Sequence, residues 1–165
     1  MRITCGGCYF MEKNVSDIHK WLAAWPERIR LVPYERMVHG NWHKIAWTGE
    51  PEELTALRPV IDGQIKGGCM SMLACPTILE LQSVKGTKGA MLNRLKSLTG
   101  KENAVVWAIG DYENDLNMLQ MADRRATPAN GIDALKALPG IVEVCDHDEG
   151  AIAGLIRHIE RELDG

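Results

Sequence analysis

The sequence predicts an α/β protein in two parts, a small α+β layer followed by a doubly wound parallel sheet. Up to about residue 82, two helical segments lie among short strands with alternating polar residues, which is typical of a sheet with one covered face. Beyond that point helical and strand segments alternate, which indicates a parallel sheet. Residues 104–109 form a continuous apolar run, as expected of a strand covered on both faces. We place the boundary near residues 80–86.

In the first part, apolar spacing and prolines define the expected elements. Apolar residues at one-face spacing predict a helix over 15–25 that ends before Pro26, and Pro51 opens a second helix over 50–61. The remaining apolar segments predict strands over 2–12, where two glycines introduce a kink, and over 29–32, 43–47, 68–74 and 78–82.

In the second part, the same spacing rules predict more helix than strand. Helices are expected over 88–98, 115–122, 132–137 and 150–163. Strands are expected over 104–109 and 141–145, with a short segment over 126–128 that breaks at Pro128.

Composition and charge are those of an ordinary globular protein. The 165 residues carry a net charge of -3, which gives no indication of a nucleic-acid or anionic-membrane partner. No apolar stretch approaches the roughly 20 residues needed to cross a bilayer, and residues 1–15 lack the apolar region of a signal peptide. We therefore expect a cytoplasmic protein.

The five cysteines do not suggest a disulfide framework. Cys5 and Cys8 form a CxxC pair, which allows a redox site or half of a zinc site, but no second pair completes a zinc site. Structural thiols are the interpretation we favour.

Two carboxylates and an amide follow the apolar run 104–109. Gly110-Asp111 ends the expected strand, and Asn114 and Asp115 begin the next helix. Ligands of open α/β sheets bind at the carboxyl ends of the strands, and Mg²⁺ prefers oxygen ligands. The alternative is helix capping, which explains Asn114 and Asp115 better than Asp111.

A glycine-flanked lysine opens the helix over 88–98. In Lys85-Gly86-Thr87-Lys88-Gly89 the ammonium group and the backbone N–H groups can face a phosphate. The phosphate-binding pattern of P-loop proteins is absent, and an ordinary turn with a solvated lysine is the alternative.

Together, residues 79–89 and the run Ala108-Ile109-Gly110-Asp111-Tyr112-Glu113-Asn114-Asp115 closely resemble the haloacid dehalogenase (HAD) superfamily, nearest to its type IIB, Cof-like phosphatases. The resemblance implies that Lys88 neutralises the substrate phosphate and the aspartyl-phosphate intermediate. It implies Mg²⁺ binding by Asp111 and Asp115, with Asn114 and, more loosely, Asn130 as supporting groups. The turn Asp148-Glu149-Gly150 also matches.

The resemblance implies a domain assignment as well. Residues 1–81 resemble an α+β cap domain, with a linker at 1–8, and residues 82–165 resemble the C-terminal half of a Rossmann-like core. Loops of the cap domain face the active site in this family. Candidate substrate contacts are therefore Tyr34, Arg36, His39, Asn41, Trp42 and His43, although an exposed polar loop explains them equally.

The aspartate nucleophile of the family lies in an N-terminal apolar-strand–DxD motif, which would precede Met1. The segment 141–148 also reads as a strand followed by DxD, but capping of the last helix by Asp146 and Asp148 is favoured. Without the nucleophile, we expect a truncated chain with weak Mg²⁺ binding and no meaningful phosphatase activity. Strand 104–109 would have an unpaired edge, through which the chain would dimerise or pair with another chain.

The sequence thus predicts a fragment of a Mg²⁺-dependent phosphohydrolase for small phosphorylated metabolites, such as sugar phosphates. The alternative is a non-catalytic binding or assembly module derived from the same fold.

Overall fold

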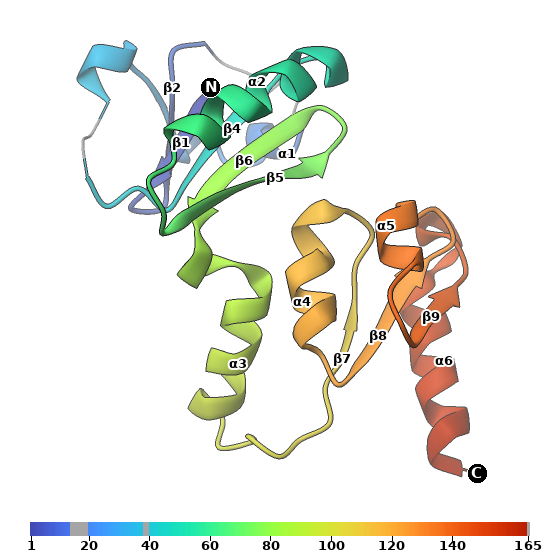
Figure 1. Cartoon of the computed structure of the whole chain (residues 1–165). Helices are drawn as coiled ribbons and strands as arrows, with labels where there is room; N and C mark the ends of the chain where they lie inside the picture. Colours follow the sequence, from blue (N-terminus) through green and yellow to red (C-terminus); the bar gives the residue numbers. More distant parts are fainter. Residues whose placement is uncertain (14–19, 38–39, 165) are drawn as a thin grey trace. The chain divides into compact units, whose positions relative to one another are not determined.

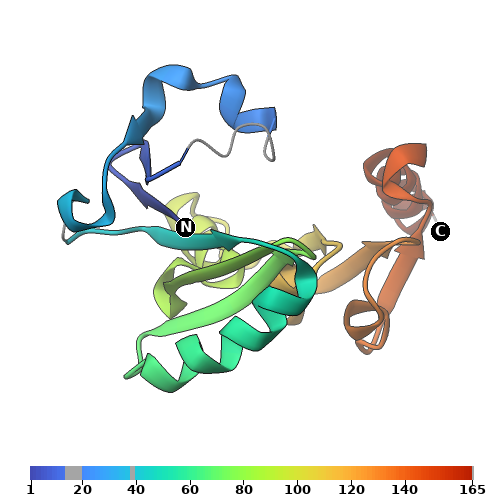
Figure 2. The same cartoon turned by 90° about the horizontal axis from the view of Figure 1, so that it is seen from above.

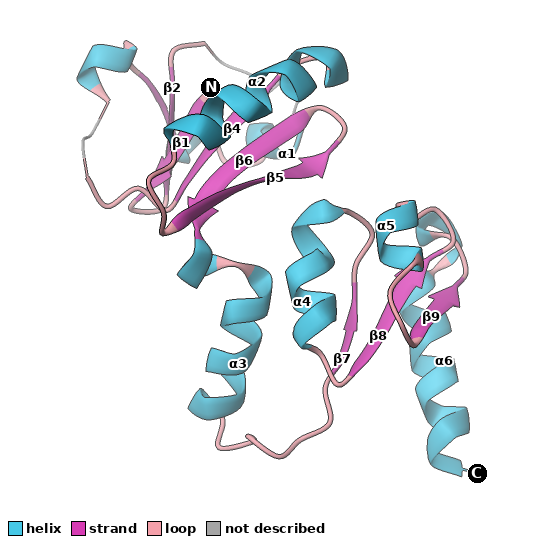
Figure 3. Ribbon diagram, viewed as in Figure 1, coloured by secondary structure: helices cyan, strands magenta, loops and turns pink. Residues whose placement is uncertain are grey.

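The computed structural model describes residues 1–13, 20–37 and 40–164. The chain divides into two compact units, Met1–Val84 and Lys85–Gly165 (Figure 1). Each unit has its own sheet and helices (Figure 3). In the part of the chain that the structure describes, no helix combines the length and apolar character needed to cross a membrane.

The first unit is built on a six-stranded sheet with the order β3-β2-β1-β4-β6-β5. Neighbouring strands are antiparallel, except that β2 and β3 are parallel. The strands are β1 (Arg2–Cys5), β2 (Cys8–Met11), β3 (Ile29–Leu31), β4 (Lys44–Thr48), β5 (Cys69–Cys75) and β6 (Ile78–Ser83).

Residues 2–12 form a hairpin, so the prediction of one kinked strand was wrong. β1 and β2 pair from Arg2↔Met11 to Cys5↔Cys8. Gly6 and Gly7 make the two-residue turn with φ values of 54° and 76°. Positive φ at both central positions is the requirement of a type I′ hairpin turn, which glycine meets without steric cost. The thiols of Cys5 and Cys8 are free.

Helix α2 (Pro51–Gln64) packs against β5 and β6 (Figure 2). The side chains of Glu50 and Glu53 form a reciprocal capping box at its start, and Leu54 is buried. Ser71 of β5 donates from Oγ to Asp62 Oδ1 at 2.6 Å, which ties the last turn of the helix to the sheet. The helix extends three residues beyond the predicted end. Of the helix predicted over 15–25, the structure gives α1 (Lys20–Ala23), and residues 14–19 lie outside the described residues.

Three charged side chains join the central strands of this sheet. Lys44 Nζ on β4 lies 2.8 Å from Glu80 Oε2 on β6. Arg2 and Glu80 are both buried, and Arg2 lies 5.6 Å above the ring of Tyr9. Burial lowers the pKa of the Arg2 guanidinium, while the charge of Glu80 acts in the opposite direction.

The second unit contains a parallel sheet, as predicted. The order of its strands is β7-β8-β9. A small core of Ala108, Leu119, Ala122 and Leu135 joins the sheet to its helices. The strands are β7 (Trp107–Ile109), β8 (Arg124–Pro128) and β9 (Ile141–Val144), and the helices are α3 (Lys88–Leu98), α4 (Leu116–Met121), α5 (Asp133–Lys136) and α6 (Ala151–Asp164).

Strand β7 is shorter than the apolar run that predicts it. The backbone N–H of Val106 donates to Asp123 Oδ2 at 2.9 Å, and Lys96 Nζ lies 3.3 Å from the same oxygen. Val105 is 69% exposed. The expectation of a strand over 104–109 covered on both faces was therefore wrong for its first three residues, because a carboxylate holds Val106 where the ladder would begin.

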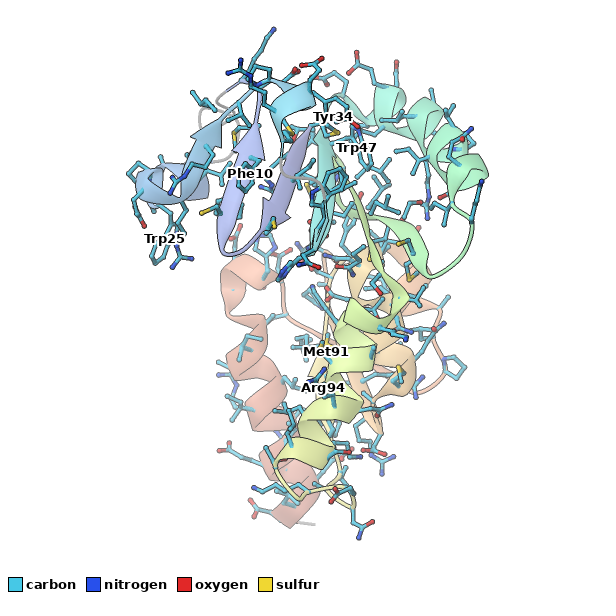
Figure 4. The ribbon with its side chains drawn as sticks, turned by 90° about the vertical axis from the view of Figure 1, so that its left-hand side faces the viewer. Phe10, Trp25, Tyr34, Trp47, Met91 and Arg94 are labelled. Atoms are coloured by element: carbon cyan, nitrogen blue, oxygen red, sulfur yellow. The ribbon has the colours of Figure 1, made fainter. Side chains whose placement is uncertain are left out.

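Apolar side chains on two helices of this unit lie in solvent. Leu92 of α3 packs against the core, whereas Met91, Leu95 and Leu98 are exposed. Figure 4 shows Met91 and Arg94 on α3. Ile152, Ile156 and Leu163 of α6 are exposed as well. Among the described residues, β7 pairs only with β8, so it is an edge strand.

The Val106–Asp123–Lys96 contacts predict an acid-sensitive element. They hold the pKa of the Asp123 carboxyl below its ordinary value of 3.8, with the Val106 N–H as the largest cause. A depressed folded-state pKa contributes stability that is present above the unfolded-state value and is lost as the pH falls through the folded-state value. We expect Asp123→Asn to reduce this acid dependence in denaturant unfolding between about pH 5 and pH 2.

The control variant is Lys96→Met, which keeps the Val106 hydrogen bond. NMR titration should give Asp123 a lowered pKa in this variant too. A return of the Asp123 pKa to its ordinary value in Lys96→Met would show that the lysine, and not the backbone, is the cause.

Candidate functional site

The site lies at the carboxyl end of β7, where Gly110 and Asp111 leave the sheet. A short 3₁₀ helix over Glu113–Asp115 follows and leads into α4. The backbone N–H of Asp111 donates to Asp115 Oδ2 at 3.2 Å. Asp115 is only 4% exposed, and its carboxylate makes no capping hydrogen bond to α4. The alternative interpretation, that Asp115 caps the following helix, is therefore wrong for this side chain.

Lys88 approaches the same carboxylate from α3. Its Nζ lies 2.5 Å from Asp115 Oδ1. Thr87 caps this helix, because its Oγ1 accepts from the Ala90 N–H at 3.2 Å. The same hydroxyl donates to Asn117 Oδ1 of α4 at 2.9 Å. Lys88 is thereby held beside the Asp111–Asp115 segment. Its side chain is 48% exposed, so it is solvated as the alternative expects, but it also has a fixed carboxylate partner.

Gly110 makes room for the Asp115 carboxylate. A Cβ atom at position 110 would lie 2.3 Å from Asp115 Cβ and 2.6 Å from its Cγ. Such distances are far below van der Waals contact, so any larger residue must displace the aspartate. Glycine at the end of β7 is therefore a requirement of the site.

These groups open into a pocket of about 500 Å³, which is in the usual range for small-molecule sites. Its lining combines charged and polar side chains with apolar ones. The lining residues are Lys88, Ile109, Gly110, Asp111, Asp115, Met118, Pro128, His147, Gly150, Ala151 and Ile152.

The Asp111 and Asp115 carboxylates fit a divalent cation that prefers oxygen. Asp111 is exposed on the pocket wall, and Asp115 is fixed beside it by Lys88 and by a backbone N–H. Two carboxylates, with water and substrate oxygens, make a set that Mg²⁺ accepts, because this ion usually retains several waters. Asn114, which lies between the two aspartates in the sequence, is half-buried.

His147 on the pocket wall is a residue that the sequence analysis missed. It follows β9 in a 3₁₀ turn over His147–Glu149. The available signal was that Asp146-His147-Asp148 follows a parallel strand, at the same sheet edge as Asp111. Asp146 caps this turn, accepting from the Asp148 N–H at 3.0 Å, so the expectation that it caps the last helix was wrong for Asp146.

Asp146, His147 and Asp148 place their ligand-type atoms within 4.8 Å of one another. The two carboxylates, however, lie beside different ring nitrogens, Asp146 at 3.2 Å from Nδ1 and Asp148 at 3.1 Å from Nε2. A metal ion bound to Nδ1 would lie near the Asp146 carboxylate only, and one bound to Nε2 would lie near the Asp148 carboxylate only. The Asp111–Asp115 pair therefore fits Mg²⁺ better. Asn130 contacts the His147 ring and does not line the pocket.

The residues proposed for substrate contact belong to the first unit. Tyr34 and Arg36 lie in a 3₁₀ turn, and the His43 N–H donates to the Thr4 carbonyl at 2.9 Å. Trp42 is half-buried. His39 lies outside the described residues. All pocket residues belong to the second unit.

A family model for haloacid dehalogenase-like hydrolases matches residues 10–156. The chain belongs to this family. The matched range includes Lys88 and the Gly110–Asp115 segment.

Named relatives include phosphatases. The chain is 35% identical over 79 residues to 5-amino-6-(5-phospho-D-ribitylamino)uracil phosphatase YwtE of Bacillus subtilis, covering 48% of this chain and 27% of that protein. A protein of Streptococcus mutans UA159 has a similar structure, with a TM-score of 0.78 at 21% identity over 99% of this chain and 61% of the other. A sugar phosphatase of HAD subclass IIB gives a TM-score of 0.74 at 16% identity, over 96% of this chain and 60% of the other.

The structural similarities establish a fold shared with these proteins. This chain covers between 27% and 47% of the first three curated relatives and about 60% of the similar structures. Part of each of those proteins therefore has no counterpart in residues 1–165.

Gly110→Ala tests the packing of the site. The added methyl group must displace the buried Asp115 carboxylate, so we expect a loss of about 1–3 kcal/mol in unfolding free energy. Gly86→Ala is the matched control, because a Cβ atom there meets nothing within 4 Å and should change stability little. Equal stability of the two variants in urea unfolding would contradict the close approach of Gly110 and Asp115.

Proposed function

We propose that this chain forms part of a Mg²⁺-dependent phosphohydrolase that acts on small phosphorylated metabolites, with sugar phosphates as one such class. The observation that carries the proposal is the convergence of Lys88, Asp111 and Asp115 on one pocket at the carboxyl end of β7. Membership of a hydrolase family and the phosphatases among the relatives support it. In this proposal residues 1–81 are the cap domain, with Arg36, His39, Trp42 and His43 as substrate contacts, and residues 82–165 belong to the core.

Lys88 would stabilise the phosphoryl group. Its ammonium group lies at the first residue of an eleven-residue helix, where the helix dipole adds positive potential. The 2.5 Å contact with Asp115 fixes the ammonium group before any ligand arrives. Such preorganised charge is the largest contribution to phosphoryl transfer in general.

Asp111 and Asp115 would hold the Mg²⁺ ion, which would neutralise phosphate charge. Asn114 would support them in the segment that carries both, and Asn130 would act through His147. The two carboxylates are few ligands for this ion, so we expect weak binding in the chain alone.

We also propose that residues 1–165 do not turn over substrate by themselves. Covalent phosphoryl transfer requires a carboxylate in line with the leaving group. Asp146 is engaged as the cap of its turn and as a neighbour of His147, and Asp148 is 86% exposed. Neither carboxylate lines the pocket, which supports the proposal that this chain alone does not turn over substrate.

The test uses the purified full chain with a generic phosphate ester and Mg²⁺. We expect no turnover, weak Mg²⁺ binding by calorimetry, and a loss of about tenfold or more in Mg²⁺ affinity in Asp111→Asn. Lys88→Met should abolish binding of inorganic phosphate, whereas Lys85→Met in the same loop, outside the pocket, should preserve it. Turnover that Asp111→Ala abolishes would refute the proposed inactivity, and equal Mg²⁺ affinity in Asp111→Asn would refute the metal site.

The second candidate function is that of a non-catalytic binding or assembly module, and the edge of β7 favours it. We propose that this edge takes a further strand from another chain, or from a second copy in a dimer. Unpaired strand edges and contiguous apolar surface promote such association. The exposed side chains of Met91, Leu95, Leu98 and Val105 lie on α3 and on the segment before β7.

In solutions of the isolated chain the available partner is a second copy. We expect light scattering to give a dimer at tens of micromolar concentration, and the double variant Leu95→Glu, Val105→Lys to give a monomer. Val60→Lys on α2, where valine is 61% exposed in the first unit, is the control and should preserve the dimer. A wild-type monomer at every concentration would refute pairing between copies.

A further inference from the structure

We infer that His147 is a ligand-contacting residue of the Lys88 pocket, and that its Nε2–H donates to an oxygen of the bound phosphoryl group. The inference rests on the proposed function and deepens it, since it assigns a second donor to the same anion. Four observations lead to it: position, orientation, the proton on Nε2 and charge.

The position of His147 follows from the parallel sheet. β7 and β9 both end at the same edge, so Asp111 after β7 and the turn after β9 lie on the same side. The pocket is accordingly lined by Lys88 from α3, Asp111 and Asp115 from the segment after β7, and His147 from the turn after β9. Three separate elements thus bring polar side chains to one cavity.

The ring is oriented although it is 57% exposed. Asn130 follows β8 and accepts the His147 backbone N–H at its Oδ1, at 3.3 Å. The amide nitrogen of the same side chain contacts ring Nδ1. Asp148 lies beside Nε2. Fixing an exposed side chain costs conformational entropy, and such preorganisation is typical of residues that bind a ligand.

The contact with Asp148 places a proton on Nε2. Asp148 Oδ1 lies 3.1 Å from this nitrogen, and a carboxylate oxygen accepts a hydrogen bond, so Nε2 is the donor. Ring Nδ1 lies beside Asn130 Nδ2 and 3.2 Å from Asp146 Oδ1. Asp148 is 86% exposed, so water readily solvates its carboxylate when Nε2–H turns to a ligand.

The charge of the pocket explains why a second donor is needed. Asp115 already engages the Lys88 ammonium group, and Asp111 adds a second carboxylate to the pocket lining. Among the described residues that line the pocket, Lys88 and His147 alone have side-chain N–H donors. An anion bound there would therefore accept from His147 as well as from Lys88.

The test is a titration of the full chain with inorganic phosphate at millimolar concentration in the presence of Mg²⁺. We expect the ring NMR signals of His147 to shift with saturation, while those of His158, which packs against Trp107 with ring centroids 5.5 Å apart, stay unchanged. In calorimetry His147→Ala should weaken phosphate binding about tenfold, as for a hydrogen bond to a charged group. Its Mg²⁺ affinity should stay that of the wild type.

Two further variants separate contact from structure. His147→Gln keeps a donor and should restore part of the phosphate affinity. Asn130→Ala removes one of the contacts that orient the ring and should weaken phosphate binding less than His147→Ala does. His158→Gln is the matched control and should bind phosphate as the wild type does.

The outcomes distinguish this inference from the proposed function. If Lys88→Met weakens phosphate binding and His147→Ala does not, the His147 contact is refuted and the proposed function stands. If the wild-type chain shows no saturable phosphate binding, both are refuted. Loss of Mg²⁺ affinity in His147→Ala would place His147 at the metal and refute its role as a phosphate donor.

Discussion

The buried carboxylate of Asp115 is the constraint on which the candidate site depends. A carboxylate removed from water must find charged or N–H partners, or it destabilises the fold. Here the Lys88 ammonium group takes one oxygen and the Asp111 backbone N–H takes the other. Both partners come from the ends of regular elements, so one aspartate fixes the relative positions of β7, α3 and the turn between β7 and α4.

The parallel sheet gathers the remaining groups. Its strands end at one edge, and the polar residues that follow β7, β8 and β9 therefore meet there: Asp111, Asn130 and His147. Asn130 links to His147 by a hydrogen bond, and the Asp111 carbonyl accepts from the Ile132 N–H at 3.1 Å. The loops after neighbouring strands are thus joined to each other as well as to the sheet. A site built on such loops has little freedom to change shape without a change in the sheet.

The sequence predicted those parts of the site that depend on the starts of helices and the ends of strands. Lys88 at a helix start and Asp111 at a strand end could be paired because both features have clear signals, a Gly-flanked turn and an apolar run ending in Gly-Asp. His147 escaped because a histidine between two aspartates equally suggests a cap. The run 104–106 reads as strand by hydropathy, yet Asp123, seventeen residues after Val106, competes for that backbone N–H. The apolar stripe of α3 predicts a core-facing side, but among the described residues only Leu92 of that stripe packs against the core.

Thr87 has a consequence for how the start of α3 is held in place. Its hydroxyl bonds the first turn of α3 to Asn117, two residues after Asp115 on α4. The start of α3 is therefore joined to the Asp115 segment by two separate contacts, this hydrogen bond and the Lys88–Asp115 ion pair. Loss of the ion pair alone would leave the helix start still tied to α4 through Thr87.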